Sequence, residues 1–172
     1  KSKVEPDMHD VVQRIYSHAI RKVGEAMVHN YLMLPTDLAV TKSVDNKAVR
    51  HNKNVNHLDE DDIALDIGGA PIERAAKAIG RAQTVIWNGT MGMAELPEFA
   101  HGSARVALEL AEHPDTTSII GGGDTADFAL HWDARGGDSF THVSTGGGAS
   151  IELMAGKKLR GIEALMDARH HG

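Results

Sequence analysis

The sequence of 172 residues contains no cysteine, and this absence limits the chemistry open to it. A disulfide framework, a thiolate metal site and a thiol nucleophile are all excluded, and the lack of cysteine fits a reducing compartment. Long apolar runs are missing too, because none approaches the roughly 18 residues that a membrane-spanning helix needs. We therefore expect a soluble, cytoplasmic protein with no membrane partner, whose chemistry uses oxygen, nitrogen or backbone groups.

Positive charge is the next scarce feature of the chain. Lysine and arginine together number 18 against 24 aspartates and glutamates, which gives a formal net charge of −6 at pH 7. We do not expect such a chain to bind nucleic acid through a broad positively charged surface. Its length and its 41% content of hydrophobic residues fit one domain of ordinary size with a buried core.

Short apolar segments alternate with helical patterns along most of the chain. A first helix is predicted after Pro6-Asp7 from apolar residues that recur in steps of three and four from Val12 to Met27. Residues 41–62 are predicted to form a solvated loop over a charged binding site. Strands are expected at 31–40 with an interruption, 63–67, 84–87, 117–120 and 141–144, and further helices at 71–79, 97–110, 123–130, 151–154 and 162–166. This alternation predicts the α/β class, with a Rossmann-like, three-layer, doubly wound parallel sheet in one domain.

Two glycine triplets follow directly after expected strands. They are Gly121-Gly122-Gly123 and Gly146-Gly147-Gly148. In open α/β sheets, ligands bind beyond the carboxyl ends of the strands, where a glycine turn lets backbone N–H groups approach an anion at the start of the next helix. Glycine also serves tight turns and close packing without any ligand. Two triplets in equivalent places favour phosphate or nucleotide binding.

Asp124 and Thr125 follow the first triplet, at the position where the next helix needs an N-cap. A carboxylate beside bound phosphates is also a suitable ligand for Mg²⁺, which prefers one or two carboxylates together with phosphate oxygens. Capping and metal binding both stay open for Asp124. Several other motifs are absent: the Walker loop, the dinucleotide fingerprint, the serine elbow and the His-Glu-x-x-His zinc helix.

Five strings in the sequence carry a more specific signal. They are Leu34-Pro35-Thr36-Asp37, Leu65-Asp66-Ile67-Gly68, and the segments 84–92 (TVIWNGTMG), 119–126 (IIGGGDTA) and 142–150 (HVSTGGGAS). In their order and spacing these strings resemble the carboxyl-terminal, nucleotide-binding domain of the phosphoglycerate kinase family. The resemblance reaches from the first helix to Leu165, so it covers nearly the entire chain.

The resemblance implies an enzyme that transfers a phosphoryl group between 1,3-bisphosphoglycerate and ADP, giving 3-phosphoglycerate and ATP with Mg²⁺. It also implies roles for individual residues. These are Gly121, Gly122, Gly123 and Thr125 near the nucleotide phosphates, Asp124 near Mg²⁺, Asn88 beside the phosphate chain, Glu95 at the ribose hydroxyls, and Gly146-Gly147-Gly148 near the transferring group. Gly123, Gly146 and Gly147 are thereby the residues expected to act in catalysis.

On this resemblance, residues 1–172 form the nucleotide-binding domain without its first strand and without the amino-terminal substrate domain. ADP and ATP are then the expected partners, 3-phosphoglycerate binds only with the missing amino-terminal domain, and the complete enzyme is expected to be monomeric. An alternative function is a non-catalytic nucleotide-binding or interaction module derived from the same domain. A missing strand would expose a sheet edge or face, so we also expect limited stability, dimerisation or aggregation.

Overall fold

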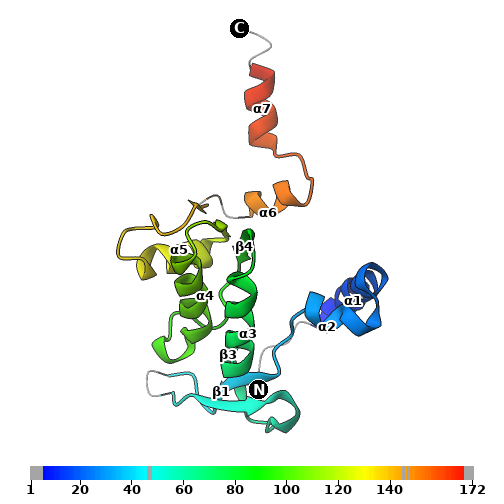
Figure 1. Ribbon diagram of the computed structural model, residues 1–172, viewed down its shortest axis with the longest axis vertical. Coiled ribbons are helices and arrows are strands. Elements are labelled where there is room, and N and C mark those ends of the chain that lie inside the picture. The colour runs from blue at the N-terminus through cyan, green and yellow to red at the C-terminus, as the bar shows by residue number, and fades with distance from the viewer. Residues whose placement is uncertain (1–5, 46–47, 145, 147, 169–172) are drawn as a thin grey trace. The chain divides into compact units, whose positions relative to one another are not determined.

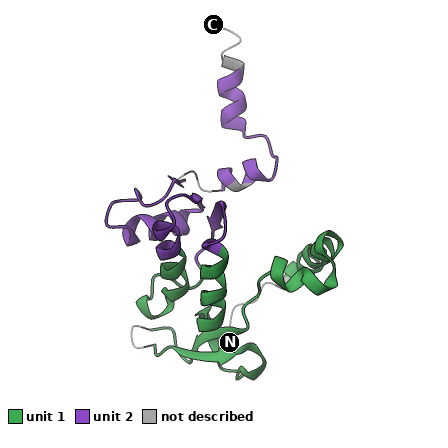
Figure 2. Ribbon diagram, in the orientation of Figure 1, with its two compact units in different colours: residues 1–78, 91–106 green, residues 79–90, 107–172 purple. Residues whose placement is uncertain are grey.

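The computed structural model describes residues 6–45, 48–144, 146 and 148–168 (Figure 1). The chain divides into two compact units, which Figure 2 shows in different colours. Unit 1 comprises residues 1–78 and 91–106, and unit 2 comprises residues 79–90 and 107–172. Among the described residues, no helix combines the length and the apolar character needed to cross a membrane.

Unit 1 contains an antiparallel sheet of three strands in the order β2-β1-β3, formed by β1 (Asp37–Thr41), β2 (His51–Asn54) and β3 (Ile63–Ile67). The helical elements with residues in this unit are η1 (Pro6–Met8), α1 (His9–Val23), η2 (Glu25–Met27), α2 (Val28–Tyr31), η3 (Val55–His57), α3 (Gly69–Ile79), η4 (Pro97–Phe99) and the first half of α4 (His101–Glu112). Helix α1 ends at Gly24, whose φ of 80° lies in a region that favours glycine and whose N–H donates to the carbonyl of Ile20.

The interior of unit 1 combines a small apolar cluster with a buried ion pair. Phe99 and Ala39 are fully buried and form a cluster with the buried Ala48, and Leu65 and Leu96 pack against it. An Arg50 nitrogen lies 2.9 Å from an Asp66 carboxylate oxygen, and the Asp66 side chain is 0% exposed. Arg50 also donates to the carbonyls of Ile67 and Glu98, so one side chain joins the end of β3 to η4.

Unit 2 contains a parallel sheet in the order β4-β5-β6, formed by β4 (Thr84–Asn88), β5 (Thr117–Gly121) and β6 (His142–Val143). Its helices are the second half of α4, α5 (Gly123–Trp132), α6 (Ala149–Met154) and α7 (Arg160–Ala168). Helix α5 packs against the sheet, where the Phe128 ring meets the Trp87 ring edge-on at a centroid distance of 6.1 Å. Ile120 in the central strand is fully buried.

The α/β class and a parallel sheet with helices are confirmed. Each of the predicted helices forms, although Pro97 opens a short 3-10 turn and α4 begins only at His101. The prediction over 31–40 was wrong in its first half, because Tyr31 ends helix α2 and strand structure begins at Asp37. The prediction of a loop over 41–62 was also wrong in part, because β2 and η3 lie within it.

Strand β3 forms where it was predicted but pairs differently from the expectation. It lies antiparallel to β1, with Leu38 opposite Ile67, and its register shifts at Ala39 and Val40. The parallel sheet of the described residues therefore consists of β4, β5 and β6 alone. The extent of the domain stays a prediction.

Candidate functional site

The carboxyl ends of β4, β5 and β6 lie at one edge of the parallel sheet. Asn88, the last residue of β4, is the register partner of Gly121, the last residue of β5. Beyond β6, the Ser144 N–H donates to the Ile120 carbonyl at 2.8 Å. The structure therefore brings Asn88, the first glycine triplet and the segment after β6 to neighbouring strand ends. Ligands of open α/β sheets bind at this edge.

The first glycine triplet forms the bend between β5 and α5. Gly122 has a φ of 89°, in the region that favours glycine, and a Cβ placed there would lie 3.3 Å from Asn88 Oδ1. A Cβ placed at Gly121 would lie 3.4 Å from Asn88 Nδ2, whereas one at Gly123 would meet no atom within 4 Å. The bend is thus closely packed against Asn88 but open at Gly123, where the backbone of the first turn of α5 begins. An anion can approach such a helix start.

Asp124 lies in the first turn of α5 and is exposed. Within the described part of the chain, its carboxylate makes no hydrogen bond or ion pair, and α5 has no side-chain cap at Gly122. The capping interpretation of Asp124 is therefore not supported by a contact. A free carboxylate one residue beyond an open glycine backbone fits Mg²⁺, which takes few protein ligands when phosphate oxygens complete its shell.

Thr125, the next residue, is 1% exposed, and its Oγ1 accepts a hydrogen bond from the Gly89 N–H at 2.8 Å. This contact joins the first turn of α5 to the residue that follows β4. A Cβ at Gly122 would lie 3.4 Å from the same oxygen, so Thr125 also lies close under the glycine bend.

The second glycine triplet follows β6 and leads to α6. Ser144 Oγ lies 2.7 Å from Ser150 Oγ in α6, and the Gly146 N–H donates to Ser144 Oγ at 3.4 Å. Ser150 also approaches the first bend, because a Cβ placed at Gly121 would lie 3.9 Å from Ser150 Cβ. The second triplet therefore starts beside the first. Gly147 lies outside the described residues.

Glu95 belongs to unit 1. It lines a cavity of about 280 Å³ that combines acidic and apolar side chains. The lining residues are Asp45, Ala48, Glu95, Leu96, Pro97, Glu98 and Phe99. The carboxylates of such a cavity can accept hydrogen bonds from hydroxyl groups, and its apolar wall offers a surface for a flat ring.

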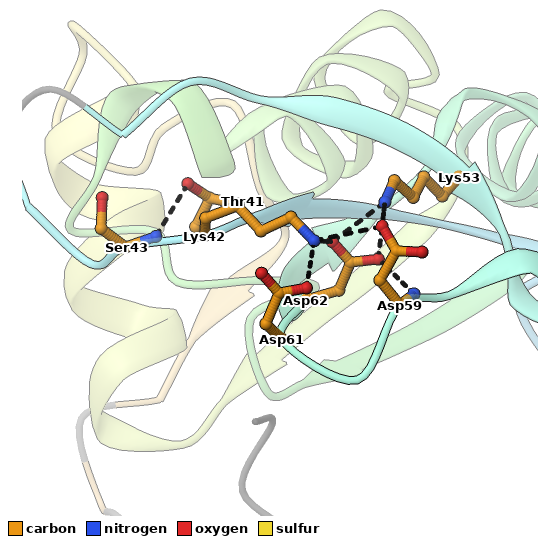
Figure 3. Close-up of polar contacts among 7 residues, drawn as sticks. All are labelled: Thr41, Lys42, Ser43, Lys53, Asp59, Asp61 and Asp62. Carbon is orange, nitrogen blue, oxygen red and sulfur yellow. Dashed lines mark hydrogen bonds and ion pairs between the residues drawn. The ribbon is translucent and has the colours of Figure 1, made fainter.

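A cluster of three carboxylates also lies in unit 1, next to two lysines (Figure 3). The Lys42 ammonium contacts Asp61 and lies 2.8 Å from Asp62 and 3.1 Å from Asp59. Lys53 lies 2.6 Å from Asp59 and 2.8 Å from Asp62. The carboxylate oxygens of the three aspartates are close enough for a metal ion to reach all of them.

The two lysines decide the electrostatics of this cluster. Hydrogen bonds from Lys42 and then Lys53 hold the pKa of the Asp62 carboxyl well below its usual range, and contact with Asp61 and Asp62 raises the pKa of Lys42. Both ammonium groups therefore stay charged at neutral pH and occupy the oxygens that a cation would use. The cluster is a network of ion pairs that joins the residue after β1, β2 and the segment before β3.

Two residues of the site were missed by the sequence analysis as site residues, although both lie within the quoted strings. The Gly89 N–H donates to Thr125 Oγ1, and Ser150, in the first turn of α6, contacts Ser144 through its hydroxyl. The signal available for Gly89 was its place directly after a strand in an Asn-Gly pair, which marks a turn. The contact of Ser150 depends on how the chain returns from β6, which no local pattern encodes.

The fold and the site define a class before any comparison is made. A parallel sheet whose strands end in glycine bends, each followed by a helix, is typical of α/β proteins that bind their ligands at the carboxyl edge of the sheet.

The chain belongs to the phosphoglycerate kinase family, whose model matches residues 1–157. It is 40% identical to the phosphoglycerate kinase of Dictyoglomus turgidum over 167 residues, which is 97% of this chain and 40% of that protein. It is 44% identical to the enzyme of that name from Listeria monocytogenes serotype 4b over 138 residues, or 80% of this chain and 34% of that protein.

Solved structures agree with this assignment. The structure of phosphoglycerate kinase from Coxiella burnetii matches 91% of this chain with a TM-score of 0.81 and 30% identity. That of the Pyrococcus horikoshii enzyme matches 92% with a TM-score of 0.67 and 27% identity. This chain covers 38% and 39% of those two chains, and it spans 40% or less of the curated relatives named above.

Proposed function

We propose that this chain is the part of a phosphoglycerate kinase that binds Mg-ADP and Mg-ATP. In this proposal the complete enzyme is a glycolytic phosphotransferase of the cytoplasm with a carboxyl group as acceptor. It exchanges a phosphoryl group between 1,3-bisphosphoglycerate and ADP, giving 3-phosphoglycerate and ATP. The observation that carries the proposal is the glycine bend between β5 and α5, which packs against Asn88 at Gly121 and Gly122 and is open at Gly123, directly before Asp124.

The proposed roles are those that the family resemblance implies, and the arrangement of the strand ends supports those of Asn88 and the first glycine triplet. Backbone N–H groups of Gly121, Gly122 and Gly123 and of the first turn of α5 hold nucleotide phosphates, and Asn88 lies beside the phosphate chain. Gly146 and Gly147 lie near the transferring group. Phosphoryl transfer spreads negative charge over the equatorial oxygens of the transition state, so fixed N–H dipoles and a helix start stabilise it without a covalent nucleophile.

Asp124 is the proposed ligand of Mg²⁺, because its carboxylate is exposed and has no partner among the described residues. When bound, Mg²⁺ neutralises charge on the phosphate oxygens. Glu95 is the proposed acceptor for the ribose hydroxyls, supported by its position in a cavity with an apolar wall. Binding of 3-phosphoglycerate is proposed only for an enzyme that includes the amino-terminal domain.

Calorimetric titration with ADP, in the presence and absence of Mg²⁺, tests the proposal on the chain itself. We expect Asp124→Asn to weaken Mg-ADP binding by roughly tenfold or more, because a charged ligand of the metal is lost. Binding of ADP in EDTA is expected to change little. Asp127→Asn is the matched control, since Asp127 is an exposed carboxylate on the same helix, paired with His131.

The proposal fails if the unmodified chain gives no heat at millimolar Mg-ADP, or if both substitutions weaken binding equally. A coupled assay for ATP formation adds a second measurement. We expect no turnover by this chain alone and turnover once the amino-terminal domain of a relative is supplied.

A further inference from the structure

Gly89 is the residue through which the end of β4 is tied to the start of α5. Its N–H donates to Thr125 Oγ1 at 2.8 Å, and its carbonyl accepts from the Trp87 indole N–H, also at 2.8 Å. Its φ of 99° lies in the region that favours glycine, and a Cβ there would meet no atom within 4 Å. Glycine is thus required at this position by backbone conformation rather than by space.

Thr125 supplies one of these two contacts from a buried position. Thr125 as a whole is 1% exposed, so its hydroxyl lies in the interior and not at the surface. Its oxygen is instead used as an acceptor for the Gly89 N–H. Gly89 itself is exposed, so without Thr125 Oγ1 its N–H would hydrogen-bond to water and the link between the two segments would be lost.

Asn88 lies directly before Gly89 and is exposed, with its side chain over the first glycine bend. Its two side-chain polar atoms lie 3.3–3.4 Å from where Cβ atoms of Gly121 and Gly122 would stand. A change in the position of Gly89 therefore changes the direction of the Asn88 side chain over this backbone. A single hydrogen bond and one peptide unit connect Thr125 to Asn88.

We propose that Thr125 is a positioning residue of the nucleotide site: its hydroxyl oxygen fixes Gly89, which fixes Asn88 over the glycine bend, and the hydroxyl itself does not touch the nucleotide. This inference rests on the proposed function and assigns Thr125 a task different from the phosphate contact that the family resemblance implies. The resemblance places both Asn88 and Thr125 at the phosphates, whereas this inference gives the Thr125 hydroxyl an indirect role through Asn88.

A double-mutant cycle in the full chain tests the inference. Thr125→Val keeps the shape of the side chain and removes the acceptor, and we expect it to weaken Mg-ADP binding about tenfold. Thr125→Ser keeps the hydroxyl and is expected to stay within about threefold of the unmodified chain. In the Asn88→Ala background, Thr125→Val is expected to cost almost nothing further, because the side chain it positions is gone.

The hydrogen bond itself is measured without nucleotide. We expect the Gly89 amide to exchange faster with solvent in Thr125→Val than in Thr125→Ser, and its amide resonance to shift. If Thr125→Val fails to fold, Thr125→Ala removes the same acceptor without adding apolar bulk and takes its place in the cycle.

The outcomes separate this inference from the proposed function. Equal costs of Thr125→Val with and without Asn88 would show that Thr125 acts independently of Asn88 and would overturn the inference alone. An unchanged Gly89 amide would do the same. If the unmodified chain does not bind Mg-ADP at all, the proposed function fails, and the inference fails with it.

Discussion

At the scale of single residues, the Asp133 carboxylate holds the segment that leads from α5 to β6. The backbone N–H groups of Ser139, Arg135 and Gly137 donate to it at 2.9 to 3.1 Å. These contacts, that of Ser139 first, lower the pKa of Asp133, although burial opposes them. Three N–H donors on one carboxylate favour its charged form, and this links the stability of the segment to pH.

Asp133→Asn is expected to lower the unfolding temperature at pH 7 by a few degrees. A carboxyl group whose pKa is lower in the folded chain stabilises it above the ordinary aspartate pKa, and this stabilisation is lost as the pH falls through the lower folded value. The difference between variant and unmodified chain should therefore persist down to the ordinary aspartate pKa of 3.8 and shrink as the pH falls below it, as measured by thermal unfolding from pH 7 to roughly pH 2. A difference that stays constant across this range would contradict the assignment.

At the scale of elements, local sequence pattern predicted strands and helices but not which strands pair. The segments 84–87 and 117–120 form strands because β-branched and aromatic residues precede an Asn-Gly or glycine turn. Strand β2 was missed because His51–Asn54 contains no apolar residue, so no alternation marks it. The antiparallel pairing of β1 with β3 depends on contacts across more than 20 positions, which local patterns do not encode.

Like the fold, the candidate site could be predicted from the sequence only in part. Asn88 and the first glycine triplet meet because parallel strands end at one edge, and the alternation of elements predicts this. The buried hydroxyl of Thr125 was not predictable, because its partner Gly89 lies 36 positions away. Its role depends on the packing of α5 against β4.

Strand β6 contains only two residues, and side-chain contacts supplement its ladder with β5. The Ser118 N–H donates to Thr141 Oγ1 at 3.1 Å, and the Thr141 N–H donates to Ser118 Oγ at 2.9 Å. This reciprocal pair fixes the entry of β6 beside the central strand. Ser118 is buried, so a lost partner is not replaced by solvent.

Ser118→Ala is expected to increase the hydrogen exchange rate of the Thr141 and Ser144 amides about tenfold, because the Thr141 N–H loses its acceptor and the short ladder opens more often. Thr117→Ala, at the exposed neighbour, serves as the control and should leave both rates nearly unchanged. Equal protection in the two variants would mean that the backbone ladder alone holds β6.

At the scale of the whole molecule, both units carry helices with exposed apolar side chains. On α7, Ile162, Leu165 and Met166 share one face by their spacing, and Leu165 is 71% exposed. On α1, Val12 and Ile15 are half exposed. Apolar faces of this kind drive association when nothing covers them.

The unmodified chain is therefore expected to form dimers or larger species as its concentration rises, measured by size-exclusion chromatography with light scattering. Leu165→Glu should reduce this association, because it places a charge on the exposed apolar face. Ala164→Glu adds the same charge elsewhere on α7 and should have less effect. A monomer at every concentration for the unmodified chain would contradict the expectation.

The contact between Trp87 and Gly89 gives the chain an optical reporter of its own. The Trp87 indole is buried against Phe128 and donates to the turn carbonyl. Indole fluorescence depends on the polarity and hydrogen bonding of its surroundings, so emission from Trp87 will register any ligand that shifts this turn. Since Trp132 is the only other tryptophan in the sequence, replacing it by phenylalanine leaves a spectroscopic signal that originates at the glycine bend and needs no added dye.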